Sequence, residues 1–324
     1  MQCILACRTR ALGGELYRCP DCGRDQFVYH SCNHRACPQC GHADATDWIQ
    51  RQKLKLLPTP YYLVTFTVPE ALRPWLRSNQ KPGYALLLRE SAATLQDVAS
   101  QPKHLGAELG CLSVLHTWGR QLQYHPHVHC VVPAGGLRQD GLRWRRPKSP
   151  DFFLPQALLA DRFRNRLKGL LARQHPAEMA RIPSAVWRQK WVVDVQPAGS
   201  GEAALKYLSA YVYRTALGSQ RILTDEGGKI TFKFKDSADR HWHALTLPAM
   251  EFMRRFLQHV LPKGFQRVRY YGWLSPAAKA RWQRILALLD WKPAAIQTSP
   301  VVPPLCPHCA VQLIWIATLE RAPP

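Results

Sequence analysis

The chain has 324 residues, 46% of them hydrophobic, which is enough for one large core or two domains with small modules. No run of 18 apolar, uncharged residues appears and the first residues lack a signal-peptide pattern, so we expect a cytoplasmic protein rather than a membrane or exported one. The 44 Lys and Arg against 22 Asp and Glu give a net charge of +22, which favours a polyphosphate partner but leaves a ribosomal or membrane-surface protein open.

Cysteines crowd the start of the chain. Seven of the 11 fall within the first 40 residues, and one further pair, Cys306 and Cys309, lies near the end. In a reducing cytosol, clustered cysteines are typical of metal sites rather than of disulfides. Residues 1–43 are also poor in apolar runs, so we expect a bound metal to hold this segment together as a small zinc-ribbon-like domain.

Two Cys-x-x-Cys pairs separated by 14 residues predict a structural zinc site in this segment. Cys19 and Cys22 form the first pair, and Cys37 and Cys40 form the second. Each pair offers two thiolates from one tight turn, so together they supply the four soft ligands of a tetrahedral zinc. We therefore expect a zinc-binding domain over residues 1–43.

Other candidate ligands are left over by this grouping. They are Cys7, Cys32, His30 and His34. They can form a second zinc site, one of them can replace a primary ligand, or they can be ordinary buried thiols and surface histidines. Near the end of the chain, Cys306 and Cys309 offer only half a site, and an exposed pair without metal is an equal alternative.

Helices and strands mix along the central part of the chain without regular alternation. We expect helices over 43–57, between 69 and 101, and over 155–173, 202–217 and 249–260. We expect strands over 61–68, 112–117, 127–132 and 191–195, a hairpin over 137–144, and an antiparallel meander over 221–247. This mixture predicts an α+β fold with an antiparallel sheet over residues 44–290, followed by a Pro-rich linker and tail over 291–324.

One predicted strand places two histidines on the same face. His127 and His129 are two residues apart, so both imidazoles point the same way and can hold one divalent ion. A bare His-x-His pattern is common by chance, so alone it is weak evidence for a metal site. A third ligand is expected from a neighbouring strand. His116 is our candidate, with a hydrogen-bonded core histidine as the alternative. His125, which precedes a proline, is expected to lie outside the ligand set.

One predicted helix carries three tyrosines. Tyr207 and Tyr211 are four residues apart and share a face, whereas Tyr213 projects elsewhere. Phenol is a poor nucleophile near neutral pH because its pKa is near 10. A bound metal and a nearby cation lower the barrier to its attack, because they polarise the phosphate and stabilise the phenolate. Lys206 and Arg214 flank the pair and are the candidate DNA contacts. The alternative is an ordinary amphipathic helix whose tyrosines pack in the core or in a groove.

In their joint order, these features resemble the two-tyrosine HUH rolling-circle transposases of bacterial insertion sequences, including the N-terminal transposase zinc-binding domain. The resemblance covers nearly the whole chain, and the order of its motifs is specific where each motif alone is weak. The motifs are Cys7-Arg8-Thr9, Leu12-Gly13-Gly14, Cys19-x-x-Cys22-Gly23, Ser31-Cys32-Asn33-His34-Arg35-Ala36-Cys37-Pro38-x-Cys40, Phe66-Thr67-Val68-Pro69, Leu115-His116-Thr117-Trp118-Gly119, His125-Pro126-His127-Val128-His129, Tyr207-Leu208-Ser209-Ala210-Tyr211 and Val260-Leu261-Pro262-Lys263-Gly264-Phe265.

The resemblance implies a transposase that nicks single-stranded DNA at transposon ends and target and keeps the 5′ phosphate on tyrosine. It implies an HUH-endonuclease-like sheet flanked by helices. It also implies that His127 and His129 hold a catalytic Mg²⁺ or Mn²⁺, and that Tyr207 and Tyr211 are the nucleophiles. Family members usually begin some tens of residues before the position that matches Cys7, so we expect this chain to be N-terminally short.

Other functions stay open from the sequence alone. A related HUH replication initiator or plasmid relaxase would use the same chemistry, although the cysteine-rich segment and the Leu-His-Thr-Trp-Gly motif favour the transposase. A non-catalytic zinc-dependent DNA-binding protein explains the charge and the cysteines, but not the His-x-His strand or the tyrosine pair. A transposase built on a carboxylate triad is disfavoured, because no acidic cluster has a suitable strand context.

Overall fold

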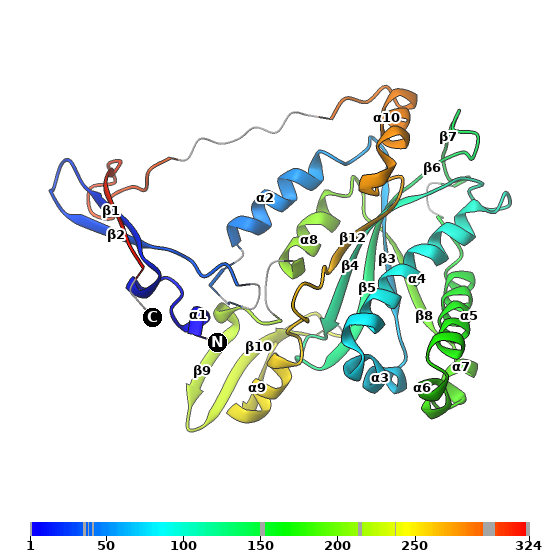
Figure 1. The fold of residues 1–324 in the computed structure, drawn as a ribbon, viewed down its shortest axis with the longest axis horizontal. Coiled ribbons are helices and arrows are strands. Elements are labelled where there is room, and N and C mark those ends of the chain that lie inside the picture. Colours follow the sequence, from blue (N-terminus) through cyan, green and yellow to red (C-terminus); the bar gives the residue numbers. More distant parts are fainter. Residues whose placement is uncertain are drawn as a thin grey trace.

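The computed structural model describes residues 2–34, 37, 39–40, 42–149, 153–212, 216–236, 238–293 and 302–321. Within these residues, helices cover both faces of a five-stranded antiparallel sheet, and a three-stranded module lies to one side (Figure 1). This arrangement confirms the predicted α+β class with a central antiparallel sheet flanked by helices. No helix of the described residues combines the length and the apolar character needed to cross a bilayer.

The central sheet has the strand order β12-β4-β5-β3-β8. In chain order its strands are β3 (Tyr61–Thr67), β4 (Gly110–Trp118), β5 (Tyr124–Pro133), β8 (Val192–Pro197) and β12 (Val268–Gly272). Successive side chains on a strand point to opposite faces. Leu115 of β4 and Val128 of β5 therefore pack into the main core on one face, whereas His116 and His127 point to the other face.

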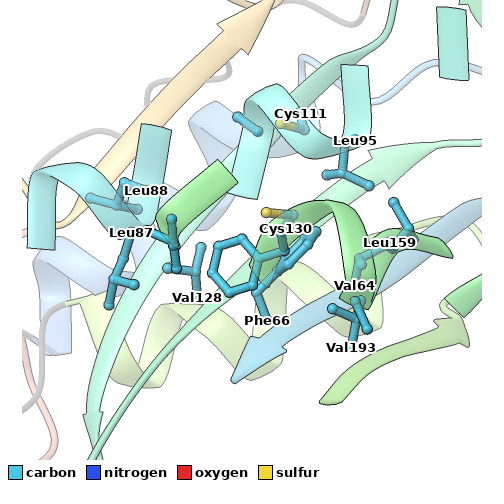
Figure 2. Close-up of a cluster of buried hydrophobic side chains, with 14 of the residues drawn as sticks. Val64, Phe66, Leu87, Leu88, Leu95, Cys111, Val128, Cys130, Leu159 and Val193 are labelled. Atoms are coloured by element: carbon cyan, nitrogen blue, oxygen red, sulfur yellow. The ribbon is translucent and has the colours of Figure 1, made fainter. Parts of the chain in front are cut away.

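Two long helices, α4 (Gln80–Ser100) and α5 (Gln156–Gln174), cover the first face. The side chains on this face of the sheet are apolar, which favours their burial under the two helices. Figure 2 shows aliphatic, aromatic and thiol side chains packed together there. The ring centroids of Phe66 on β3 and Phe163 on α5 are 4.9 Å apart in an edge-to-face contact. Each large apolar side chain buried in this way contributes about 1.5–3 kcal/mol to stability.

The opposite face carries α2 (His42–Lys53) and α8 (Glu202–Val212). Trp48 of α2 and Leu208 of α8 pack together with Val114 of the sheet in a second, smaller core. The packing of α8 against α2 and the sheet fixes where α8 crosses the strands. Helix α8 therefore lies on the same face as His116 and His127, and its Tyr207 stands beside the histidines.

A separate antiparallel meander follows α8. It consists of β9 (Ile222–Glu226), β10 (Lys229–Lys235) and β11 (Trp242–Pro248), and α9 (Ala249–Leu257) packs against it. The predicted meander is confirmed, and the turn between β9 and β10 falls at Gly227-Gly228. Two predicted helix ends are wrong, because residues 216 and 217 lie outside α8 and because α9 ends at Leu257 rather than 260.

The small module joins both ends of the described chain (Figure 1). It contains α1 (Gln2–Leu5) and a sheet of order β13-β1-β2, whose strands are β1 (Gly14–Arg18), β2 (Asp25–Tyr29) and β13 (Ile314–Leu319). The tail was predicted as a segment separate from residues 1–43, but β13 pairs along the open edge of β1. The Glu15 carboxylate secures this pairing, since it accepts hydrogen bonds from Trp315 Nε1 at 2.7 Å and Thr318 Oγ1 at 2.9 Å.

The remaining elements are short or lie at the edges of the molecule. They are α3 (Arg73–Ser78), β6 (Gly136–Leu137), β7 (Trp144–Arg145), α6 (Pro176–Arg181), α7 (Ala185–Arg188) and α10 (Lys279–Leu288), with 3-10 turns at Arg10–Leu12, Glu70–Leu72, Ser219–Arg221 and Pro276–Ala278. The β6–β7 pair confirms the predicted hairpin, whose turn has the Leu142 amide bonded to Asp140 Oδ1 at 2.9 Å.

Candidate active site and metal centres

Three histidines meet on the face of the central sheet that carries α8. The sheet register sets His116 of β4 directly opposite His127 of β5, and His129 follows on the same face. The candidate ligand nitrogens of the three side chains lie within 4.8 Å of one another. Ring centroids are 4.4 Å apart for His116 and His129 and 4.8 Å apart for His127 and His129. The predicted pair and its predicted third partner are thus brought together.

Hydrogen bonds orient two of these rings toward a shared centre. His127 Nδ1 donates to the His125 carbonyl oxygen at 2.7 Å, so the lone pair of this neutral ring is on Nε2. His129 Nδ1 lies 2.9 Å from Thr65 Oγ1 on β3. His129 Nε2 is buried and has no hydrogen-bond partner among the described residues. An unsatisfied buried ring nitrogen is costly, and coordination of a cation would satisfy it, so these residues fit a divalent ion.

Burial keeps the three imidazoles neutral. It lowers the pKa of His127 to about 4. Burial first, and then the neighbouring histidines, hold the pKa values of His116 and His129 well below the ordinary value for histidine. Neutral imidazole is the form that binds metal ions, so all three rings are ready to act as ligands at neutral pH.

Helix α8 brings one of the two predicted nucleophiles beside the histidines. The Tyr207 ring centroid is 5.7 Å from that of His129 and 6.5 Å from that of His116, and 43% of Tyr207 is exposed. Lys206, the neighbouring DNA-contact candidate, is also exposed. Tyr211 follows one helical turn later on α8. The other candidates on this segment, Tyr213 and Arg214, lie outside the described residues.

A cleft of about 680 Å³ opens next to this cluster. His116, His127 and Tyr207 line one side, and the β9–β11 meander lines the other with aromatic and basic side chains. Trp242 is 55% exposed there, with the Arg221 guanidinium 5.6 Å from its ring centroid. The sequence reasoning singled out neither Trp242 nor Arg221, because an exposed tryptophan on a strand carries no motif.

Within the described residues, eight cysteines form two clusters, and neither is the predicted group of both N-terminal pairs. The sulfur atoms within each cluster lie within 4.8 Å of one another. One cluster contains Cys7, Cys32, Cys37 and Cys40, and the other contains Cys19, Cys22, Cys306 and Cys309. This corrects the predicted zinc site, which grouped both N-terminal Cys-x-x-Cys pairs. The reason is the β1–β2 hairpin: its tip carries the first pair and its base the second, and a five-residue strand separates them by about 16 Å.

The cluster at the hairpin base is compact. Cys40 Sγ lies 3.4 Å from Cys7 Sγ and 3.6 Å from Cys32 Sγ, and the Cys32 amide donates to Cys7 Sγ at 3.4 Å. Of the leftover candidates, Cys7 and Cys32 therefore join this cluster. His30 instead lies 3.3 Å from Glu15 Oε1, and neither His30 nor His34 belongs to a metal-ligand group within the described residues.

Comparison with known proteins supplies the family. The model of the Y2_Tnp family, described as "Putative transposase", matches residues 110–281, which include the histidines and α8. The model of the transposase zinc-binding domain of the IS91 type matches residues 1–68. The chain belongs to the IS91-type transposases. The family resemblance expected from the motifs is thereby confirmed, and the N-terminal module is a transposase zinc-binding domain.

Two curated relatives span most of this IS91-type transposase. "Putative transposase y4qJ" of Sinorhizobium fredii is 39% identical over 294 residues, covering 85% of this chain and 73% of the relative. "Transposase for insertion sequence element IS801" of Pseudomonas savastanoi pv. phaseolicola is 29% identical over 289 residues, covering 84% and 68%. Among solved structures, the conjugative relaxase TrwC in complex with OriT DNA is 14% identical with a TM-score of 0.27 over 72% of this chain and 73% of that one, a likeness too low to support an argument.

Proposed function

We propose that this IS91-type transposase cuts and rejoins single-stranded DNA through a covalent link between a tyrosine and the 5′ phosphate. One observation carries the proposal: an accessible tyrosine, Tyr207, stands beside three neutral, converging histidines at the edge of an open cleft. A nucleophile beside a metal-ligand set is the arrangement that phosphoryl transfer requires.

His116, His127 and His129 would hold the ion, with Mg²⁺ or Mn²⁺ as the expected metal. When bound, the ion polarises a non-bridging oxygen of the scissile phosphate. Imidazole nitrogens suit Mn²⁺ better than Mg²⁺, which prefers oxygen ligands, so we expect the higher activity with Mn²⁺. Thr65 positions the His129 ring through its hydrogen bond to Nδ1.

Tyr207 supplies the attacking oxygen in the proposed step. Its Oη forms a bond to phosphorus and loses its proton, the bond from phosphorus to the 3′ oxygen breaks, and that oxygen takes up a proton. The 5′ phosphate then remains on the tyrosine as a diester, so the bond energy is conserved and a 3′-OH can reverse the step without ATP. Tyr211, one turn along α8, is the proposed second nucleophile for the other DNA end.

The walls of the cleft support a single strand as the substrate. Its far side presents the exposed Trp242 next to Arg221 and Lys235. Aromatic faces stack on unpaired bases, whereas the basic side chains neutralise the backbone phosphates. The net charge of +22 fits the same partner. We further propose that the DNA is that of transposon ends and target sites, as the family membership favours.

The competing functions account for fewer of these features. A replication initiator or relaxase would use the same residues, but the family match favours transposition. A non-catalytic zinc-dependent DNA-binding protein needs neither the histidine cluster nor a tyrosine beside it. The two classes therefore differ in one measurable property, which is covalent DNA cleavage.

A nicking assay tests the proposal. Oligonucleotides tiled across the DNA that flanks the gene are offered as single strands and as duplexes, with Mn²⁺, with Mg²⁺ or with chelator. We expect metal-dependent cleavage of a single strand, reduced about 100-fold or more in His129→Ala but not in the matched variant His125→Ala, whose ring instead bonds Arg73 at 3.0 Å. Cleavage of duplex DNA alone, or full activity of His129→Ala, contradicts the proposal.

A further inference from the structure

We propose that Cys19, Cys22, Cys306 and Cys309 form a second zinc site, which fastens the C-terminal tail to the N-terminal module. The four sulfur atoms lie within 4.8 Å of one another, and Cys22 Sγ is 3.8 Å from Cys306 Sγ. Four thiolates are the preferred ligand set of a structural zinc. The site goes beyond the zinc-binding domain that the family match covers, because that match ends at residue 68. It is independent of the proposed nuclease activity.

The two Cys-x-x-Cys turns of this site have the same backbone hydrogen bonds. In the first turn, the Cys19 amide donates to the Arg24 carbonyl at 3.0 Å and the Gly23 amide donates to the Cys19 carbonyl at 3.0 Å. In the second turn, the Cys306 amide donates to the Val311 carbonyl at 2.8 Å and the Ala310 amide donates to the Cys306 carbonyl at 2.9 Å.

The turns also match in φ and in the surroundings of the first sulfur. Gly23 and Ala310 occupy the same place and both have positive φ, 69° and 56°. The first cysteine of each turn, Cys19 or Cys306, accepts hydrogen bonds on its sulfur from the two backbone amides at the end of the turn. Such amide bonds stabilise thiolate charge, so both turns are built to present thiolates to one centre.

The surroundings of the site show why a metal is needed. Cys19 and Cys306 are buried, yet among the described residues their cluster contains just one further buried side chain, Leu313, with Tyr17 packed partly against it. So few apolar groups cannot supply the free energy that orders two chain segments. Coordination of a structural zinc supplies the folding free energy of many small domains, and here it would be the main interaction that orders the two segments.

The site closes a very long loop. Cys22 and Cys306 are 284 residues apart, so the metal holds the tail against the module while β13 adds a strand to β1. The pairing of β13 alone leaves the tail on an edge strand with little buried area. With the metal bound, the zinc-binding module of this transposase contains both ends of the described chain, and it cannot be completed by residues 1–43.

Metal binding by the full-length chain tests the inference. Purified protein, stripped of metal, is titrated with Co²⁺, and thiolate-to-cobalt charge-transfer absorption is read because only cysteine-bound cobalt gives it. We expect two thiolate-bound ions in the wild type, one in Cys306→Ser/Cys309→Ser, and two in the matched control Cys3→Ser, since exposed Cys3 lies outside both clusters. Cys309→His keeps a ligand and should restore the second ion with a shifted spectrum.

A second measurement tests whether the metal holds the C-terminal tail to the N-terminal module. A protease site introduced at Val302, which is exposed and precedes Cys306, allows the tail to be cut from the body in the intact protein. The cut tail should co-purify with the body when zinc is bound and should separate at least 10-fold faster after chelation. One ion in the wild type, two ions in Cys306→Ser/Cys309→Ser, or a tail whose release does not depend on metal overturns the proposal, whether or not the protein nicks DNA.

Discussion

Two histidines of the candidate site, His127 and His129, differ in the hydrogen-bond partner of Nδ1. His127 donates to a backbone carbonyl, whereas His129 meets the hydroxyl of Thr65 on the next strand. Each bond holds its ring with Nε2 toward the centre, so these two side chains need little rearrangement to accept an ion. Strand periodicity alone predicts that His127 and His129 share a face. The part played by Thr65 follows only from the pairing of β3 with β5.

A fourth buried histidine, His259, makes stability depend on pH. Its Nε2 donates to the Leu122 carbonyl at 3.0 Å, its Nδ1 lies 3.3 Å from Thr117 Oγ1, and burial lowers its pKa to about 4. The unfolded chain, with a histidine pKa near 6.5, therefore binds more protons between pH 6.5 and 4, and stability falls as pH drops through that window.

The titration of His259 therefore lowers the free energy of unfolding by about 2 kcal/mol between pH 7 and pH 5. The variant His259→Gln can still donate to Leu122 but does not titrate. Urea unfolding at both pH values should show that the variant loses about 2 kcal/mol less than the wild type on acidification. The other buried histidines are present in both proteins and cancel in the comparison. Equal losses would mean that His259 is not held neutral by the fold.

At the scale of elements, the β9–β11 meander is more than a connection between α8 and α9. It forms one wall of the cleft, and its Trp242 is exposed between Arg221 and the Lys233 ammonium, which lies 5.8 Å from the ring centroid. The strands themselves were predictable from alternation and the double-glycine turn. Their position opposite the histidines was not, because it depends on how the meander and α9 pack through their own small core.

We predict that Trp242 stacks on a base of the bound strand. Trp242→Ala should weaken single-stranded DNA binding by about 1–3 kcal/mol, whereas Trp242→Phe, which keeps an aromatic face, should lose less. The dependence of affinity on salt should stay unchanged, because no charge is removed. Fluorescence anisotropy with a labelled oligonucleotide measures both quantities. A loss of the same size for Ala and Phe, or a changed salt dependence, would argue against stacking.

At the scale of the whole molecule, two assemblies depend on contacts between distant parts of the chain. The candidate active site combines β4, β5 and α8. Its residues could be proposed from the sequence because each carries a local signal: alternation on a strand or spacing on a helix. The cysteine clusters could not be grouped correctly from spacing. The hairpin of β1 and β2 holds the two N-terminal pairs apart, and the partner of Cys19 and Cys22 lies at the other end of the chain.

Spacing rules assume that the nearest pairs in sequence share a metal. That assumption fails here because β1 and β2 place one pair at the tip and the other at the base of a hairpin. The same strands explain why the tail returns, since β1 offers an open edge to β13. The residue types were therefore enough to predict a zinc-binding module. Which cysteines share a site could be read only from the fold.

The most direct test of the central claim is to locate the DNA on the protein. The transposase is incubated with a cleavable single strand and Mn²⁺, denatured, digested, and analysed by mass spectrometry for a peptide that carries a nucleotide. The account predicts an adduct on the peptide that contains Tyr207 and Tyr211, assigned to one of these two residues, lost in the double Phe variant and absent in His129→Ala. An adduct on Tyr213, an adduct that persists in the double variant, or cleavage with no covalent adduct at all would contradict it.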